Sequence, residues 1–254
     1  MTRIICIAGG KGGISKTLTT INLGAALNQF GKNVAIIDTN LTTPNIGLYL
    51  GVPVVPISLH DVLKDKNHIT EAIYQHKSGL KIIPGSISLS NINPNTNKLK
   101  KAIHSLHGLI DIALLDTPAG LGKETISVLE VSDEVLIVTN PEIPAITDAL
   151  KTIKLAKKLH KPVIGVIVAR TKNDNLEIPL ENISNLLERP IIGTIPEDPK
   201  IRNSLNEKDA IVYLYPKSTS SIAYKKIAAS LVGYNYKEEN KNFFDLLLEK
   251  LGFS

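Results

Sequence analysis

The feature that most constrains this chain is an apolar run near its start that breaks into glycines. Residues 3–8 have the pattern of a β-strand, and four of the next five residues, 9–13, are glycine. A helical pattern follows over residues 17–30, and Gly31 is expected to end it. A strand, a glycine-rich turn and a helix in this order direct backbone N–H groups and a helix N-terminus to one point. That arrangement binds phosphate groups.

The spacing within the turn sharpens this prediction. From Gly10 to Thr17 the sequence fits the phosphate-loop pattern G-x-x-x-x-G-K-[ST], in which Lys16 reaches the β- and γ-phosphates and Thr17 holds Mg²⁺. One position departs from the pattern, because Ser15 stands where the last glycine is expected. Its side chain would crowd the β-phosphate, although its hydroxyl can bond to that group. We therefore expect weakened or reshaped nucleotide binding, with an ordinary glycine-rich turn as the alternative.

An additional lysine, Lys11, extends the motif. The run from Lys11 to Thr17, KGGISKT, resembles the deviant Walker A motif, KGG-x-[G/A/S]-K-[ST], of the MinD/ParA ATPases. The resemblance implies that Lys11 reaches the phosphates of a partner subunit in an ATP-dependent homodimer. It extends over about residues 3–231. It places ATP or ADP against Gly10, Lys11, Gly12, Gly13, Ile14, Ser15, Lys16, Thr17 and Leu18.

Two aspartates follow apolar runs further along the chain. Asp38 follows residues 34–37, and Asp116 follows residues 110–115. The carboxyl ends of parallel strands meet at one edge of a sheet, where ligands bind, although a lone aspartate there is often only a turn residue. The segment from Asp116 to Gly120, DTPAG, resembles the D-x-P-A-G switch of the family. The resemblance implies a Mg²⁺ site formed by Thr17, Asp38 and Asp116.

The hydrolytic residues depart from the family pattern. Asn40 replaces the second acid of the D-x-D switch, and an amide can orient water but cannot act as a general base. Asn45 matches an asparagine that approaches the attacking water in MinD-like proteins. We expect slow basal hydrolysis that depends on Lys11, Lys16, Asn40 and Asn45. An Asn40→Asp substitution is expected to speed turnover in a single-turnover assay.

The base side of the site resembles the family less completely. The segment 138–142, VTNPE, and the later segment TDAL at 147–150 match MinD-like sequences, and IGTIPED at 192–198 resembles the turn that borders adenine. This turn implies base contacts from Pro196 and Asp198. Relatives carry an asparagine where this chain has Ala169, while Arg170 remains and can stack on a purine. Selectivity for adenine therefore stays open.

The order of the segments predicts the fold class. Strand-like and helix-like segments alternate, which indicates an α/β, doubly wound, mostly parallel sheet with helices on both faces, the three-layer fold of P-loop NTPases. At 254 residues and 43% hydrophobic, the chain can bury one sizeable core. The expected strands are 3–8, 34–37, 80–84, 110–115, 134–139, 163–169 and 191–195, with a loop at 86–97. The expected helices are 17–30, 58–63, 145–160, 180–187, 200–206 and 220–231.

The end of the chain differs from this body. We expect an ATPase domain at 1–232, a polar linker at 233–241 and an amphipathic helix at 242–254. The tail resembles the membrane-targeting helix of MinD-like members, but its polar face lacks an excess of lysine and arginine. The alternatives are a helix docked on its own domain and a helix in the groove of a protein partner. Its apolar face consists of Phe243, Phe244, Leu247, Leu248 and Leu251.

Composition limits the compartment and the chemistry. The lone Cys6 excludes an internal disulfide and is expected to be buried and inert. Nothing resembles a signal peptide or a membrane span, so the expected location is cytoplasmic, with the tail as a means of peripheral contact with the inner face of the cell membrane. The net charge of +5 suits anionic partners. The lysines at positions 151, 154, 157, 158 and 161 could contact DNA, but a solvated helix face is the favoured explanation for them.

These observations favour a MinD-like ATP-binding switch. It is expected to be a slow ATPase that dimerises with ATP and binds a membrane, a protein partner or both to position a cellular structure. A non-hydrolysing nucleotide-binding scaffold is one alternative, suggested by Ser15, Asn40 and Ala169. A ParA-type ATPase that binds DNA is another, with strong salt dependence. Iron–sulfur relatives are disfavoured because their cluster cysteines are missing.

Overall fold

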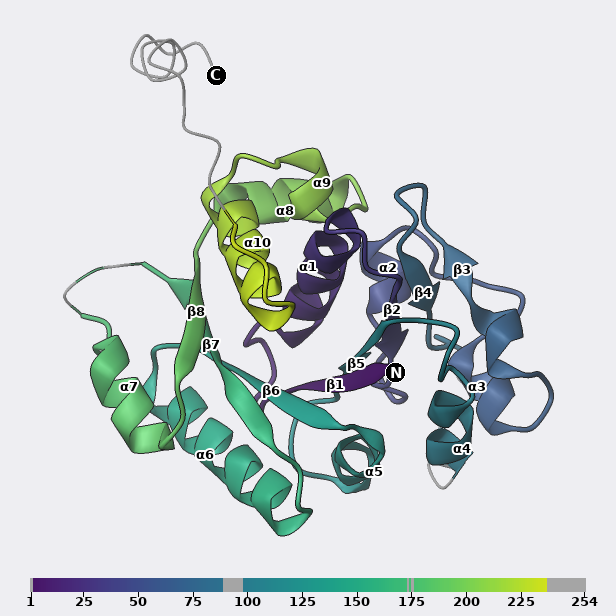
Figure 1. Ribbon diagram of the computed structural model, residues 1–254, viewed down its shortest axis with the longest axis horizontal. Coiled ribbons are helices and arrows are strands. Elements are labelled where there is room, and N and C mark those ends of the chain that lie inside the picture. Colours follow the sequence, from purple (N-terminus) through teal and green to yellow (C-terminus); the bar gives the residue numbers. More distant parts are fainter. Residues whose placement is uncertain (1, 89–97, 173, 175, 237–254) are drawn as a thin grey trace, which may run out of the picture.

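The computed structural model describes residues 2–88, 98–172, 174 and 176–236, and within them it shows one central sheet (Figure 1). Eight strands lie in the order β3-β4-β2-β5-β1-β6-β7-β8. All neighbours are parallel except β3 and β4, which form an antiparallel pair at one edge. The strands are β1 (Arg3–Ala8), β2 (Val34–Asp38), β3 (Tyr74–Gln75), β4 (Lys81–Ile83), β5 (Ile112–Asp116), β6 (Glu134–Thr139), β7 (Val163–Thr171) and β8 (Ile191–Pro196).

Helices cover both faces of this sheet. One core cluster packs α1, α9 and α10 on one face, and the other packs α3 to α7 on the opposite face. The fold is therefore the predicted three-layer α/β arrangement. The helices are α1 (Lys16–Gln29), α2 (Ile46–Tyr49), α3 (Leu59–Leu63), α4 (Leu99–His104), α5 (Lys123–Val131), α6 (Ile143–Lys158), α7 (Leu180–Leu187), α8 (Pro199–Asn206), α9 (Ile211–Leu214) and α10 (Thr219–Leu231), with the 3₁₀ helix η1 (Ile69–Ala72).

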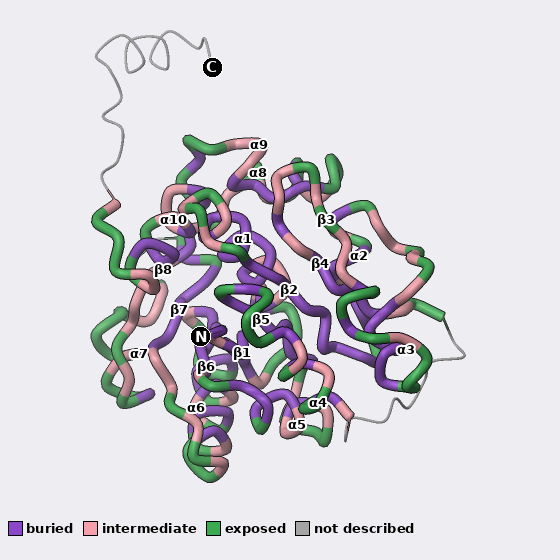
Figure 2. Tube along the Cα trace, turned by 45° about the vertical axis from the view of Figure 1, so that its right-hand side comes forward, coloured by how far each residue is buried: buried purple, intermediate pink, exposed green. Residues whose placement is uncertain are grey.

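The central strands are buried along almost their whole length. Every residue of β2 and β5 is buried, and β1 is buried apart from Arg3 (Figure 2). Strands covered by helices on both faces need no alternation of polar and apolar residues, which explains their continuous apolar runs. Gly24 lets α1 approach β2, because a Cβ at this position would lie 2.5 Å from Cγ2 of Ile36. The helix that follows the glycine-rich loop is thereby held closely against the centre of the sheet.

The sequence located the long elements well and missed short ones. Gly31 ends the first helix with a φ of 75°, as expected. The predicted strand 110–115 is β5, which ends on Asp116, and the predicted helix 145–160 is α6, which starts earlier because Pro144 fits its first turn. Some elements were not predicted, because they are short or, in α5, rich in β-branched residues. These are α2, η1, β3, α4, α5 and α9.

Several predictions lie outside the described residues. The amphipathic tail at 242–254 is one, and so is most of the predicted loop at 86–97. The division into domain, linker and tail stays a prediction. Among the helices in the described part of the chain, none is long and apolar enough to cross a membrane.

Candidate functional site

The glycine-rich loop runs through a space that admits no side chain at its first two positions. A Cβ at Gly9 would lie 2.5 Å from the carbonyl oxygen of Val138 in β6, and one at Gly10 would lie 2.7 Å from that of Asp148 in α6. The backbone N–H of Gly120 donates to the carbonyl oxygen of Gly10 at 2.9 Å. The loop is therefore held between the ends of β5 and β6, directly before α1.

Ser15 adopts a backbone conformation that suits glycine. It is the N-cap of α1 with φ 73° and ψ 24°, in the left-handed region, and its side chain makes no capping hydrogen bond. A residue with a Cβ is strained there by roughly 1–2 kcal/mol. The sequence predicted crowding of the phosphate at this position, and the structure adds backbone strain.

The two lysines of the loop point to different partners. Lys16 is buried, and its Nζ donates to the carbonyl oxygen of Lys11 at 2.9 Å. Burial lowers the pKa of Lys16, while the nearby Asp116 opposes that shift. The side chain of Lys11 is exposed, and its Nζ lies 3.8 Å from the carboxylate of Glu142. Only Lys16 is therefore packed inside the loop.

Two buried aspartates lie beside this loop. Asp38 and Asp116 are register neighbours on β2 and β5, and neither has exposed surface. The Thr17 hydroxyl donates to Oδ2 of Asp116 at 2.6 Å. Oδ2 of Asp38 accepts from the backbone N–H groups of Asn45 and Ile46 at 2.8 and 2.9 Å. Within the described residues, Oδ1 of Asp38 is buried and has no hydrogen-bond partner.

The electrostatics of the pair fit a divalent cation. Burial raises the pKa of Asp116 to about 6, and burial together with the charge of Asp116 raises the pKa of Asp38 well above its ordinary value. Two adjacent buried carboxylates repel one another when both are ionised, and either a retained proton or a bound cation relieves that repulsion. No cluster of three or more His, Cys, Asp or Glu forms among the residues described. Mg²⁺ suits such a site, because it keeps several waters and binds phosphate oxygens as well.

The predicted water-positioning amides are both engaged locally. Oδ1 of Asn40 accepts from the backbone N–H and the hydroxyl of Thr43 at 3.3 and 3.1 Å. The Asn45 amide donates to the carbonyl oxygen of Thr43 at 2.8 Å. The loop after β2 therefore brings both asparagines together around Thr43, a residue that the sequence analysis did not single out.

Comparisons with known proteins agree with this geometry. A family model described as ParA, NUBPL iron-transfer P-loop NTPase, matches residues 1–232. The septum site-determining protein MinD of Synechocystis sp. is 34% identical over 240 residues, which are 92% of this chain and 90% of that protein. This chain belongs to the MinD/ParA family of P-loop ATPases. An uncharacterized ATP-binding protein of Methanocaldococcus jannaschii is 38% identical over 251 residues, covering 98% of this chain and 95% of the relative.

Solved MinD structures share the fold. MinD of Pyrococcus horikoshii OT3, complexed with Mg-ADP, matches with a TM-score of 0.87 and 38% identity over 91% of this chain and 96% of that one. MinD of Aquifex aeolicus, in a MinC:MinD complex, matches with a TM-score of 0.84 and 32% identity over 94% and 98%. These relationships confirm the predicted family and fold class. Membership of a P-loop NTPase family also indicates, in general terms, a nucleotide, Mg²⁺ and ATP hydrolysis.

The iron transfer named for the matching family model does not suit this chain. Cys6 is the single cysteine of the sequence, and it lies buried in β1. Burial raises the pKa of its thiol, which makes the thiolate form unfavourable. An iron–sulfur cluster held by several cysteines of one chain is therefore excluded, and the expected inert role of Cys6 fits its position.

The base side lies at the end of β7 and β8, where the structure offers fewer fixed groups. Ala169 is fully buried in the core beneath α1 and α10. Arg170 is exposed with a left-handed φ of 59°, and its guanidinium lies 3.5 Å from the carboxylate of Glu197. Asp198 accepts from the backbone N–H of Lys200 at 2.9 Å and so caps α8. Asp198 therefore has a structural role besides the predicted contact with the base.

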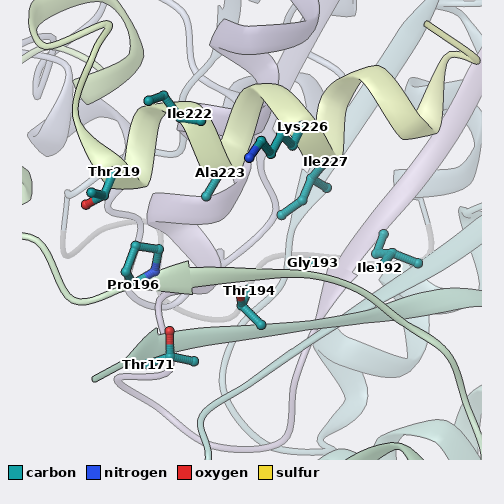
Figure 3. A pocket seen from close by; sticks show the side chains of 10 residues that line it. All are labelled: Thr171, Ile192, Gly193, Thr194, Pro196, Thr219, Ile222, Ala223, Lys226 and Ile227. Carbon is teal, nitrogen blue, oxygen red and sulfur yellow. The ribbon is translucent and has the colours of Figure 1, made fainter. Parts of the chain in front are cut away.

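A hollow of about 470 Å³ opens between β8 and α10 near this side (Figure 3). Thr171 and Pro196 line its end at the carboxyl edge of the sheet, and Ile192 and Ile227 line the opposite end. A second hollow of about 310 Å³ shares Thr171 and extends toward Pro141 at the end of β6. Neither is lined by the glycine-rich loop, so these hollows lie beside the phosphate site.

The structure reveals two functional candidates that the sequence analysis did not name. Glu124 lies in the first turn of α5 and accepts from the hydroxyl of Thr42 at 2.5 Å. His60 of α3 is buried and contacts the carbonyl oxygen of Leu41 at 2.9 Å. Both side chains touch the loop after β2, which carries the two asparagines. The sequence analysis did not predict α5. A helix predicted shortly after the DTPAG segment would have drawn attention to Glu124, the acidic residue of its first turn.

Proposed function

We propose that this protein is a MinD-like switch that hydrolyses ATP slowly and forms a dimer while ATP is bound. The observation that carries the proposal is the separation of the two loop lysines. Lys16 is packed within its own loop, whereas Lys11 is exposed beside Glu142 on the outer side. A lysine in that place can reach the phosphates of a second copy, where its charge would stabilise the transferring phosphoryl group.

Within one subunit, different residues would bind the phosphates, the metal ion and the attacking water. Backbone N–H groups of the loop and Lys16 hold the phosphates, and Thr17, Asp38 and Asp116 hold Mg²⁺, which neutralises phosphate charge when bound. Asn40 and Asn45 orient the attacking water, because an amide can both accept and donate hydrogen bonds. Neither amide can take up the proton of that water. Slow turnover follows from the missing carboxylate at position 40.

Light scattering with ATP, ADP and a slowly hydrolysed analogue tests the dimer. The unmodified protein should double in mass with ATP and the analogue only, and Lys11→Ala should remove that change while leaving nucleotide affinity largely intact. Lys154→Ala provides the matched control, because Lys154 is an exposed lysine on α6. A Lys11→Ala protein that still dimerises with ATP would exclude the trans role.

A non-hydrolysing scaffold is the second candidate, and one observation favours it. The amide oxygen of Asn40 is occupied by Thr43, so the loop in this conformation offers that oxygen to no water. A single-turnover assay distinguishes the two functions. Measurable phosphate release that stops in Lys16→Ala supports the switch, whereas an intact dimer with no release over many hours supports the scaffold.

The remaining parts of the proposal concern the tail and the location of the protein. We propose a domain at 1–232, a linker at 233–241 and a helix at 242–254 that places a cytoplasmic protein on the inner face of the membrane. A single short amphipathic helix anchors weakly, and dimerisation would double it. Deletion of residues 242–254 should abolish ATP-dependent sedimentation with liposomes. Undiminished sedimentation would exclude the tail from membrane binding.

A protein partner is also part of the proposal. It is supported by the solved complex of the Aquifex aeolicus relative with MinC. DNA is the alternative partner, since Lys154, Lys157 and Lys158 are exposed on α6. Retention on DNA that falls steeply with added salt would favour the ParA-type function, because phosphate contacts release counterions.

A further inference from the structure

Glu124 joins two loops of the site that are distant in sequence. Its Oε1 accepts from the hydroxyl of Thr42 at 2.5 Å, across a separation of 82 residues. Thr42 belongs to the loop after β2, and Glu124 lies in the first turn of α5, four residues after Gly120, which ends the DTPAG segment. The bond therefore links the loop that carries the asparagines to the segment that starts at Asp116.

The same two loops are also tied where their strands end. The Thr39 hydroxyl donates to the carbonyl oxygen of Asp116 at 2.6 Å. This hydrogen bond fixes the start of the loop after β2, and the hydrogen bond between Thr42 and Glu124 fixes the same loop three residues later. Asn40 lies between these two points. The position of Asn40 thus depends on both hydrogen bonds, and of these two only the bond between Thr42 and Glu124 joins two side chains.

The carboxylate of Glu124 is only partly satisfied. Its Oε2 is buried, and among the described residues no group donates a hydrogen bond to it. A buried carboxylate oxygen without a partner is unfavourable, so simple packing does not explain a glutamate here. A charged acceptor does strengthen the bond from Thr42, because hydrogen bonds to ionised groups are shorter and stronger than neutral ones.

His60 holds the same loop from α3. Its Nδ1 accepts the backbone N–H of Ser86 at 2.9 Å, so Nε2 carries the hydrogen and donates to the carbonyl oxygen of Leu41 at 2.9 Å. Leu41 directly precedes Thr42. Residues 41–42 are therefore held by α3 through the backbone carbonyl of Leu41 and by α5 through the side chain of Thr42. At these two residues, the bond to Glu124 is the contact that connects the loop to the helix after the DTPAG segment.

We propose that Glu124 is a positioning residue that couples the loop after β2 to the DTPAG segment through Thr42. The inference rests on the proposed function, since its purpose is to place Asn40 and Asn45 for hydrolysis. Asn40 has no carboxylate with which to polarise water, so the rate depends on where the loop holds the two amides. Through this bond, a conformational change in the DTPAG segment would shift the loop after β2, and a change in that loop would shift the segment.

A double-mutant cycle tests the coupling. Thr42→Val removes the hydroxyl with little change of shape, and Glu124→Ala removes the acceptor. Each should slow single-turnover hydrolysis about tenfold, the size of one hydrogen bond to a charged group, and the double variant should be no slower than either single one. Thr42→Ser should restore the rate, because it keeps the hydroxyl. Glu130→Ala, an exposed glutamate at the end of the same helix, should have no effect.

Measured affinity for nucleotide distinguishes a loss of hydrolysis from a loss of ATP binding. All variants should bind a fluorescent ATP analogue within about twofold of the unmodified protein, because the bond acts on the loop and not on the phosphates. Effects of the two substitutions that multiply, or a Thr42→Val protein with an unchanged rate, would overturn the inference and leave the proposed function standing. An unmodified protein that releases no phosphate at all would overturn both.

Discussion

The centre and the edge of the sheet hold their functional side chains in opposite ways. At the centre, Asp38 and Asp116 have no exposed surface and are fixed by register, a hydroxyl and backbone N–H groups. At the edge, Arg170 and Glu197 pair at 3.5 Å with side chains that are 51% and 45% exposed. The residues proposed to hold the metal are therefore fixed inside the fold, whereas the residues proposed to contact the base lie at the surface.

The same burial that would strengthen ligand binding at the centre also lowers the stability of the protein without its ligand. Buried carboxylates resist ionisation in the absence of a cation, so Asp38 and Asp116 are expected to destabilise the metal-free protein and, in the proposed site, to favour binding of a cation. Exposed ion pairs contribute about 0–1 kcal/mol, so the edge neither destabilises the fold nor selects its ligand strongly. Substitutions at Lys16, Asp116, Ser15 and Arg170 test this contrast between the centre and the edge.

Lys16→Ala should weaken ATP binding most. Removal of a buried ammonium that contacts phosphate corresponds to about 3 kcal/mol, or roughly a hundredfold in dissociation constant. Isothermal titration with ATP and Mg²⁺ measures it, and circular dichroism checks that the variant folds. A loss no greater than that of Arg170→Ala would contradict the contrast between centre and edge.

Asp116→Asn should stabilise the protein when nucleotide and metal are absent. The pKa of Asp116 is raised from 3.8 to about 6, so the folded state keeps a proton that the unfolded chain has already released. The contribution to stability is full below pH 3.8 and is lost as the pH rises through about 6, a deficit of about 3 kcal/mol at neutral pH. Asparagine carries no charge and avoids this loss.

Urea unfolding in EDTA measures the effect. The variant should exceed the unmodified protein by about 3 kcal/mol at pH 7.5 and match it near pH 3.5. The order should reverse once ATP and Mg²⁺ are added, because the charged carboxylate attracts the cation more strongly than a neutral amide does. Glu130→Gln, on the exposed end of α5, serves as a control that should show neither trend. An equal stability of both proteins at every pH would show that Asp116 is not destabilising.

Ser15→Gly should relieve strain at the centre. Glycine adopts the left-handed conformation freely but loses more entropy on folding, so the net gain in unfolding free energy is about 0.5–1 kcal/mol. ATP should also bind several-fold more tightly, because the crowding Cβ is gone. Glu188→Gly is the matched control, since Glu188 has a φ of 51° at the end of the distant α7. It should gain stability without any change in affinity.

Arg170→Ala should have the smallest effect. An exposed guanidinium paired with Glu197 holds a purine weakly, so affinity for ATP should fall only about twofold to threefold. Lys172→Ala is the matched control, because Lys172 lies 3.7 Å from the same carboxylate. Competition between ATP and GTP checks the base preference. A tenfold or larger loss specific to Arg170→Ala would show that the edge is as decisive as the centre.

Much of the fold followed from the sequence, and for a physical reason. Strands buried on both faces are continuous apolar runs, so the bounds of β1 and β6 were predicted as the structure has them. The edge strand β8 is mostly half-buried, but its apolar residues also predicted it to within a residue. Short elements such as α2 and α9 have no such pattern of their own, because tertiary packing stabilises them. The antiparallel β3 escaped prediction because two residues carry too little alternation to recognise.

For the site, the phosphate loop could be predicted from local sequence, because the backbone N–H groups of such a loop come from consecutive residues. The order of strands, and so the adjacency of Asp38 and Asp116, was decided by pairing between distant segments. Tertiary structure also decided that Lys11 faces outward and that Thr42 meets Glu124. Those contacts join residues far apart in the chain, and no local pattern specifies them.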